Sequence, residues 1–171
     1  MDANVSRKFW LQYYFPPEHR KFPLVAHAGI YLTENDSGGD QERFAVAFRT
    51  VWRRLPRQMK ITILEWWRSN YLRLDIGYGP LWPEPQAMGK CWEIGRMWFN
   101  SKVLDLMPNE IMRAVIRHEL CHAFIYGRVG DHDEMLARLL NDDLAGQMGA
   151  DEVDEQGINE WLSEHRDIFA S

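Results

Sequence analysis

Residues 108–130 read PNEIMRAVIRHELCHAFIYGRVG, and this stretch contains the clearest helix of the chain. Proline is well tolerated at the first position of a helix, and Glu110 in the first turn favours the positive end of the helix dipole. Gly127 and Gly130 mark the predicted end of the helix. Between these signals, helical spacing places one set of side chains on a common face: Ile111, Val115, His118, His122 and Ile125.

The same helix carries the pattern His-Glu-x-x-His, which runs from His118 to His122. Residues four positions apart lie on the same face of a helix, about one turn from each other, so both imidazoles can reach one metal ion. Zinc suits such nitrogen ligands and prefers tetrahedral geometry. Glu119 lies about 100° around the helix from His118, so it can approach a metal-activated water without binding the metal. The pattern predicts one Zn²⁺ ion, with Glu119 as the general base of a hydrolytic reaction.

A catalytic zinc site needs a third protein ligand and keeps one position for water. His132 is the best candidate, because the glycine turn after the helix can fold the chain back and present this residue at the start of the next helix. Asp131, Asp133 and Glu134 are alternative oxygen ligands. The competing interpretation is that the two helix histidines lie on a buried helix face with their hydrogen bonds satisfied and bind no metal.

The remaining segments predict a domain of mixed α and β structure. The loop signal from Asn35 to Asp40 divides the chain into an N-terminal extension (1–40), a catalytic core (41–147) and an acidic turn with a C-terminal helix (148–171). The acidic residues Asp151 to Glu155 are expected in a solvated turn. Strands are predicted at 24–32, 71–76 and 91–99, and further helices at 41–55, 58–70, 133–147 and 158–169, with Pro56 as a break.

Composition limits the class of protein. The chain of 171 residues is 46% hydrophobic and 26% charged, as expected for a globular domain. A net charge of -5 does not predict a large field that attracts nucleic acid. Only two cysteines occur, and neither a signal peptide nor a membrane-spanning run of about 18 apolar residues is visible. These features predict a soluble, cytoplasmic protein with no membrane partner.

Residues 107–140 resemble the SprT-like (Spartan-type) zinc metallopeptidases. In that family, a helix with His-Glu-x-x-His is followed, after a short glycine-containing loop, by a third histidine that opens another helix. Here the corresponding features are the pattern at 118–122, the loop at 127–131 and His132, with Leu136 where the family usually has a large apolar residue. Residues 89–94 and 99–101 look like the family's strand that leads into this helix, and the similarity extends over roughly residues 42–146.

The resemblance implies an α+β, zincin-like fold with helices packed on a small mixed or antiparallel sheet. It also implies His118, His122 and His132 as zinc ligands and Glu119 as the general base. The implied substrate is a protein or peptide, paired in extended form along an edge strand, here 91–99. The implied activity is that of an intracellular zinc metalloendopeptidase.

The chain departs from the family in two respects. It has no cysteine after Cys121, whereas many members carry a C-terminal zinc ribbon with paired cysteines, and its acidic tail does not support the DNA association of several members. Two alternatives stay open. A gluzincin- or aspzincin-type peptidase would use Glu152, Glu155 or Asp142 as the third ligand. A zinc-stabilised protein- or DNA-associated binding module would have no turnover, although such a structural site has no need of Glu119.

Overall fold

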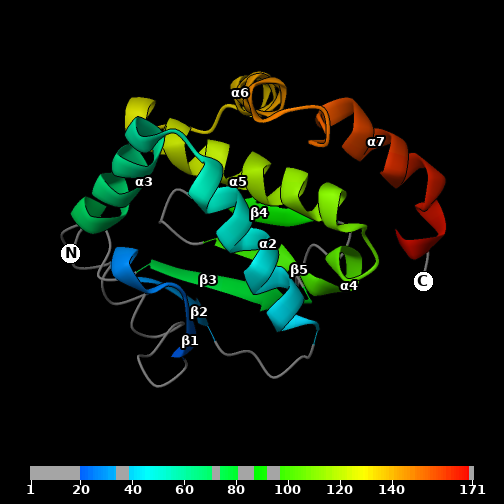
Figure 1. The fold of residues 1–171 in the computed structure, drawn as a ribbon, viewed down its shortest axis with the longest axis horizontal. Coiled ribbons are helices and arrows are strands. Elements are labelled where there is room, and N and C mark those ends of the chain that lie inside the picture. The colour runs from blue at the N-terminus through cyan, green and yellow to red at the C-terminus, as the bar shows by residue number, and fades with distance from the viewer. Residues whose placement is uncertain (1–19, 34–38, 71–73, 81–86, 92–96, 170–171) are drawn as a thin grey trace.

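The computed structural model describes residues 20–33, 39–70, 74–80, 87–91 and 97–169. Within these ranges the chain forms six α-helices and one five-stranded mixed sheet, which confirms the predicted α+β class (Figure 1). The helices are α2 (Gln41–Arg54), α3 (Arg57–Asn70), α4 (Ser101–Leu104), α5 (Asn109–Val129), α6 (Glu134–Met148) and α7 (Glu155–Glu164). The strands are β1 (Arg20–Val25), β2 (Ile30–Thr33), β3 (Leu74–Gly79), β4 (Gly89–Cys91) and β5 (Met97–Asn100).

The strands follow the order β1-β2-β3-β5-β4 across the sheet. The two outer pairs, β1–β2 and β4–β5, are antiparallel, whereas β2, β3 and β5 run parallel. Parallel neighbours require a crossover connection, and α2 and α3 provide it between β2 and β3. Residues 20–33 of the predicted extension therefore lie in the same sheet as the core strands, and β4 lies at the opposite edge.

Two segments predicted as single strands are hairpins instead. The chain reverses between β1 and β2 through a short 3-10 helix, Ala26–Ala28, and through Gly29, whose φ of 73° lies in the left-handed region that favours glycine. Cys91 pairs with Met97 in an antiparallel ladder, so the chain also reverses between β4 and β5. A run of apolar residues does not reveal such a reversal, because both arms of a buried hairpin carry the same pattern. Residues 92–96 and 71–73 of the predicted strands lie outside the described residues.

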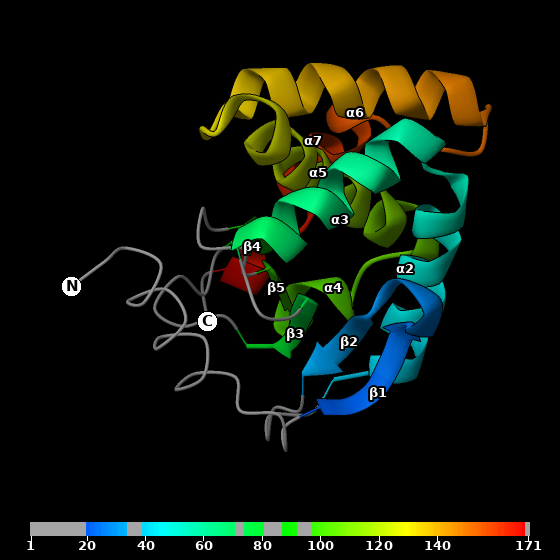
Figure 2. The same cartoon turned by 90° about the vertical axis from the view of Figure 1, so that its left-hand side faces the viewer.

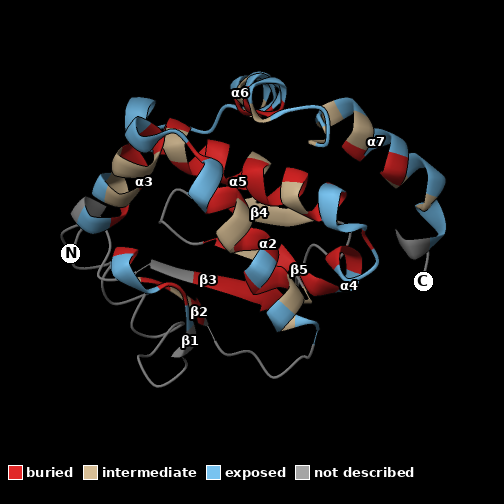
Figure 3. Ribbon diagram, in the orientation of Figure 1, coloured by how far each residue is buried: buried red, intermediate tan, exposed pale blue. Residues whose placement is uncertain are grey.

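Helix α5 lies between the sheet and α6 and packs against α2, α3, α6, α7 and β4 (Figures 1 and 2). Most of its length is buried (Figure 3). It begins directly after Pro108, within one residue of the predicted start. It ends at Gly130, whose φ of 72° lies in the left-handed region. Gly127 does not end the helix. A side chain there would lie 3.1 Å from Thr62 and Trp66, so this glycine permits close packing of α5 against α3.

The other helices largely follow the predicted pattern. Pro56 separates α2 from α3, and α6 begins and ends one residue later than expected. Helix α7 begins at Glu155, because the Asp154 side chain accepts a hydrogen bond from the Gly157 N–H at 3.0 Å and caps it. The prediction of a solvated acidic turn is wrong for Glu152, whose side chain is only 3% exposed, and for Glu155, which belongs to α7. None of the helices in the described ranges has the length and apolar character needed to cross a membrane.

Candidate metal centre

Helix α5 presents His118 and His122 on one face, one turn apart, with ring centroids separated by 4.9 Å. Their side chains are 12% and 4% exposed, so both imidazoles are largely removed from solvent. The Nε2 atom of His118 lies 3.2 Å from Oε1 of Glu134, and Nε2 of His122 lies 2.8 Å from Oε2 of the same carboxylate. The three side chains therefore converge on one point.

Glu134 reaches this point because the turn at Gly130 reverses the chain and places the first residue of α6 over α5. Asp133 caps α6 by accepting a hydrogen bond from the Leu136 N–H at 2.9 Å, which fixes where the helix begins. Arg138 contacts Oε1 of Glu134 at 3.2 Å. Because the Glu134 side chain is 43% exposed, the point of convergence is accessible from solvent.

The donor atoms of His118, His122 and Glu134 all lie within 4.8 Å of one another. Two imidazole nitrogens and one carboxylate oxygen form a ligand set that catalytic zinc sites use. The group can thus hold a metal ion, and its donor chemistry fits zinc. Glu134 was only an alternative to His132 in the sequence, because the spacing of residues 131–134 does not reveal which side chain turns inward.

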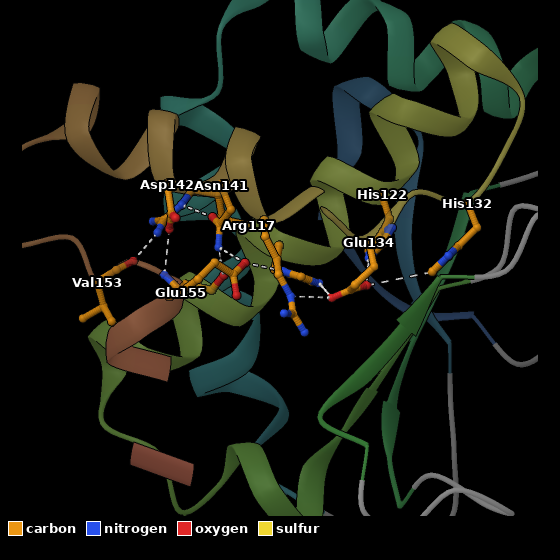
Figure 4. A network of polar contacts seen from close by, with 11 residues as sticks. Arg117, His122, His132, Glu134, Asn141, Asp142, Val153 and Glu155 are labelled. Atoms are coloured by element: carbon orange, nitrogen blue, oxygen red, sulfur yellow. Dashed lines mark hydrogen bonds and ion pairs between the residues drawn. The ribbon is translucent and has the colours of Figure 1, made fainter. Parts of the chain in front are cut away.

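His132 lies beside this group and outside it (Figure 4). Its ring stacks on that of His122 at a centroid distance of 4.7 Å, and its Nε2 lies 3.9 Å from Oε2 of Glu134. The side chain is 54% exposed. The assignment of His132 as a ligand stays a prediction.

The three carboxylates considered as distant third ligands have other partners. Glu152 forms ion pairs with Arg54, Arg113 and Arg117. Asp142 accepts a hydrogen bond from the Glu155 backbone N–H at 2.8 Å. Glu155 contacts Nδ1 of His118, on the side of the ring that faces away from Glu134. Glu134, in contrast, is the carboxylate whose donor atom lies together with those of the two histidines.

Glu119 lies where two cavities meet. Both the cavity of about 250 Å³ and that of about 310 Å³ are lined by Glu119, Glu134 and Gly89 of β4. A side chain at position 89 would lie 3.2 Å from Cγ of Glu119, so glycine lets the edge strand approach the helix. Glu119 thus faces a groove bounded by α5, α6 and the edge strand.

Burial shifts the pKa values of the ionisable side chains at the point of convergence and beside it. It raises the pKa of Glu119 to about 7, although the charge of His118 opposes this shift. Burial and the neighbouring charge of His118 lower the pKa of His122 to about 4. For His118, burial alone would lower the pKa, but the hydrogen bond that its ring donates to Glu155 and the nearby carboxylates raise the pKa overall. A low pKa keeps the His122 ring uncharged at neutral pH, so a metal ion need not displace an imidazolium proton there, and a carboxyl group with a pKa near 7 suits proton transfer.

The raised pKa predicts that Glu119 destabilises the metal-free protein above neutral pH. The folded state favours the protonated carboxyl, so the cost of ionisation is absent below the ordinary pKa of 4.5 and complete above about 7. Glu119→Gln removes this cost. Urea unfolding of chelated samples should show a gain on the order of 3 kcal/mol at pH 8, shrinking toward zero at pH 4.5. An equal gain in the free energy of unfolding at both pH values would contradict the raised pKa of Glu119.

Comparison of the chain with protein-family models, curated proteins and solved structures gave no match. The chemistry of the site is therefore argued from its own residues.

Proposed function

We propose that this protein is a zinc-dependent metallopeptidase of SprT-like type that hydrolyses peptide bonds in a protein or peptide substrate. The observation that carries the proposal is the group His118, His122 and Glu134. Glu119 lies beside this group, on the same helix as the two histidines, and faces a groove. A structural zinc site is closed by four protein ligands and has no use for an adjacent base. Three convergent ligands beside a buried carboxyl group support a catalytic site instead.

The two histidines would hold the metal through Nε2, and Glu134 would hold it through its carboxylate. Zinc bound there supplies a Lewis acid that polarises the substrate carbonyl and promotes ionisation of water. Glu119 takes the proton of the attacking water on its carboxylate and later gives that proton to the leaving amine. Its burial keeps the carboxyl poised between the two protonation states that these steps require.

Strand β4 supports an extended peptide as the substrate. It lies at the edge of the sheet, antiparallel to β5, and Gly89 brings its backbone close to Glu119. An exposed strand edge can add a peptide as a further strand through backbone hydrogen bonds. A substrate bound in this way would pass the catalytic carboxylate with its backbone extended.

A carboxylate third ligand is the specific feature that favours a gluzincin-like variant of this proposal. Glu134 meets both imidazoles, whereas the SprT-like resemblance assigns the third position to His132. The reaction and the role of Glu119 are the same in both variants. Only the identity of the third ligand differs between them.

Metal removal tests the proposed function. We expect the purified chain to bind one zinc ion and to cleave an unfolded protein such as casein. Chelation should abolish cleavage, and one equivalent of zinc should restore it, because the substrate carbonyl is otherwise not polarised. His122→Ala, purified in parallel, should not recover with zinc, which controls for a contaminating protease.

Two results would count against this function. Cleavage that persists after complete chelation would exclude a metal-dependent reaction. A chain that binds one zinc ion but cleaves no protein, with or without DNA present, would support the zinc-stabilised binding module.

A further inference from the structure

We propose that Glu155 is a positioning residue that holds His118 in the ring orientation and tautomer that metal binding requires. This inference rests on the metal centre proposed above. It assigns a role to a residue that lies 37 positions from His118 in sequence and belongs to the first turn of α7.

The first observation is the way in which the His118 ring is held from both sides. Nδ1 pairs with Oε1 of Glu155, while Nε2 faces Glu134 at 3.2 Å. A carboxylate only accepts hydrogen bonds, and of these two contacts the one at Nδ1 has hydrogen-bond geometry, so Nδ1 carries the hydrogen there. In the neutral ring, the lone pair then lies on Nε2, the atom that converges with His122. Glu155 thus selects the nitrogen that is presented to a metal.

The second observation is that Glu155 is itself fixed by neighbours (Figure 4). Asn141 of α6 donates from Nδ2 to Oε1 of Glu155 at 2.9 Å, and Asp142 accepts the Glu155 backbone N–H at 2.8 Å. Asn141 is fully buried, and the Glu155 side chain is 12% exposed. The carboxylate therefore has little freedom to leave the His118 ring.

The third observation is a buried arginine that fixes this arrangement. Arg117, next to His118 on α5, is fully buried, and its Nε donates to Oδ1 of Asn141 at 2.6 Å. Its other nitrogens bond Oε2 of Glu152 at 3.0 Å and the backbone oxygen of Val153. A buried charge is strongly destabilising unless it is paired, so these contacts hold the segment before α7 in place. Glu155 begins α7 immediately after that segment.

His122 provides an internal comparison. Its Nδ1 is buried and has no hydrogen-bond partner among the described residues. Ligand histidines usually donate their second ring nitrogen to a carboxylate or carbonyl, and loss of that partner costs roughly 10–100-fold in metal affinity. Among the described residues, such a carboxylate contacts Nδ1 of His118 but not Nδ1 of His122, so the effect of Glu155 should be specific to the His118 ring.

Zinc affinity tests the proposal. We expect Glu155→Gln to weaken zinc binding roughly 10–100-fold in a chelator competition, because glutamine keeps the shape but loses the charge that orients the ring. Glu160→Gln is the matched control. It removes the same charge from the same helix, where Glu160 is exposed and bonds only Gln156 among the contacts that the structure describes. Glu155→Gln with the zinc affinity of the parent chain would overturn the proposal.

A second measurement needs no metal, and its main result comes from the parent chain. Nitrogen-15 NMR of the metal-free chain, labelled at histidine and held above the pH at which His118 is protonated, reports which ring nitrogen carries the proton. We expect Nδ1 for His118, and a population shift toward Nε2 in Glu155→Gln. A proton on Nε2 in the parent chain would overturn the proposal even if the variant does not fold. If the parent chain binds no zinc, the proposed function fails, and this measurement alone decides whether Glu155 orients His118.

Discussion

Glu119→Gln is expected to lower the rate of peptide cleavage by roughly 10²–10⁴-fold while the chain keeps one bound zinc ion. Glutamine fills nearly the same volume, but it cannot accept the proton of the attacking water or return one to the leaving amine. Zinc content should persist, because the convergent donor atoms belong to His118, His122 and Glu134. Cleavage of a quenched fluorescent peptide and metal analysis of the same sample measure both quantities.

Glu110→Gln is the matched control for this prediction. Glu110 is an exposed glutamate in the first turn of the same helix, so its substitution changes the charge of α5 without touching the groove. The control should cleave at the parent rate. If Glu119→Gln also kept the parent rate, Glu119 would not be the general base. If it lost both zinc and activity, Glu119 would have to act on the metal itself.

The second large effect concerns the third ligand. Glu134→Ala is expected to weaken zinc binding at least about a hundredfold, since loss of a residue that only supports a ligand already costs roughly 10–100-fold. The reason is geometric, because this carboxylate lies 3.2 and 2.8 Å from the Nε2 atoms of the two histidines. His132→Ala should change zinc affinity less, because its ring lies outside the group and is half exposed. Chelator competition on both variants provides the comparison.

The two variants serve as each other's control, since His132 and Glu134 lie two positions apart at the start of α6. The reverse result, with a steep loss in His132→Ala and a small one in Glu134→Ala, would establish the ligand set implied by the SprT-like resemblance. An equal steep loss in both would indicate that the metal takes both side chains. Circular dichroism of the metal-free variants should show that neither substitution unfolds the chain.

Much of the fold was predictable because its signals are local. Pro108 and Gly130 bound α5 by their own backbone preferences, and Pro56 separates α2 from α3 for the same reason. The i and i+4 spacing of His118 and His122 places them on one face of any helix that contains them. The hairpins at Gly29 and between Cys91 and Met97 were missed, because the apolar residues before and after each reversal fit one strand as well as two paired strands.

The acidic segment before α7 illustrates what such signals leave out. Asp151 to Glu155 looked like a solvated turn because acidic runs usually face water. Arg117 was the overlooked signal, since a charged side chain on a helix that is buried over most of its length needs a partner from elsewhere in the chain. Glu152 is that partner, and it directs the backbone so that Glu155 meets His118.

The spacing along one helix was therefore sufficient to choose the two histidines and the glutamate between them, because helical geometry is set by residues within a single turn. The orientation of each ring and the carboxylates that meet it depend on the packing of α6 and α7 against α5. Those contacts join residues 12 to 37 positions apart, and their energies come from burying and pairing charges that no local pattern encodes.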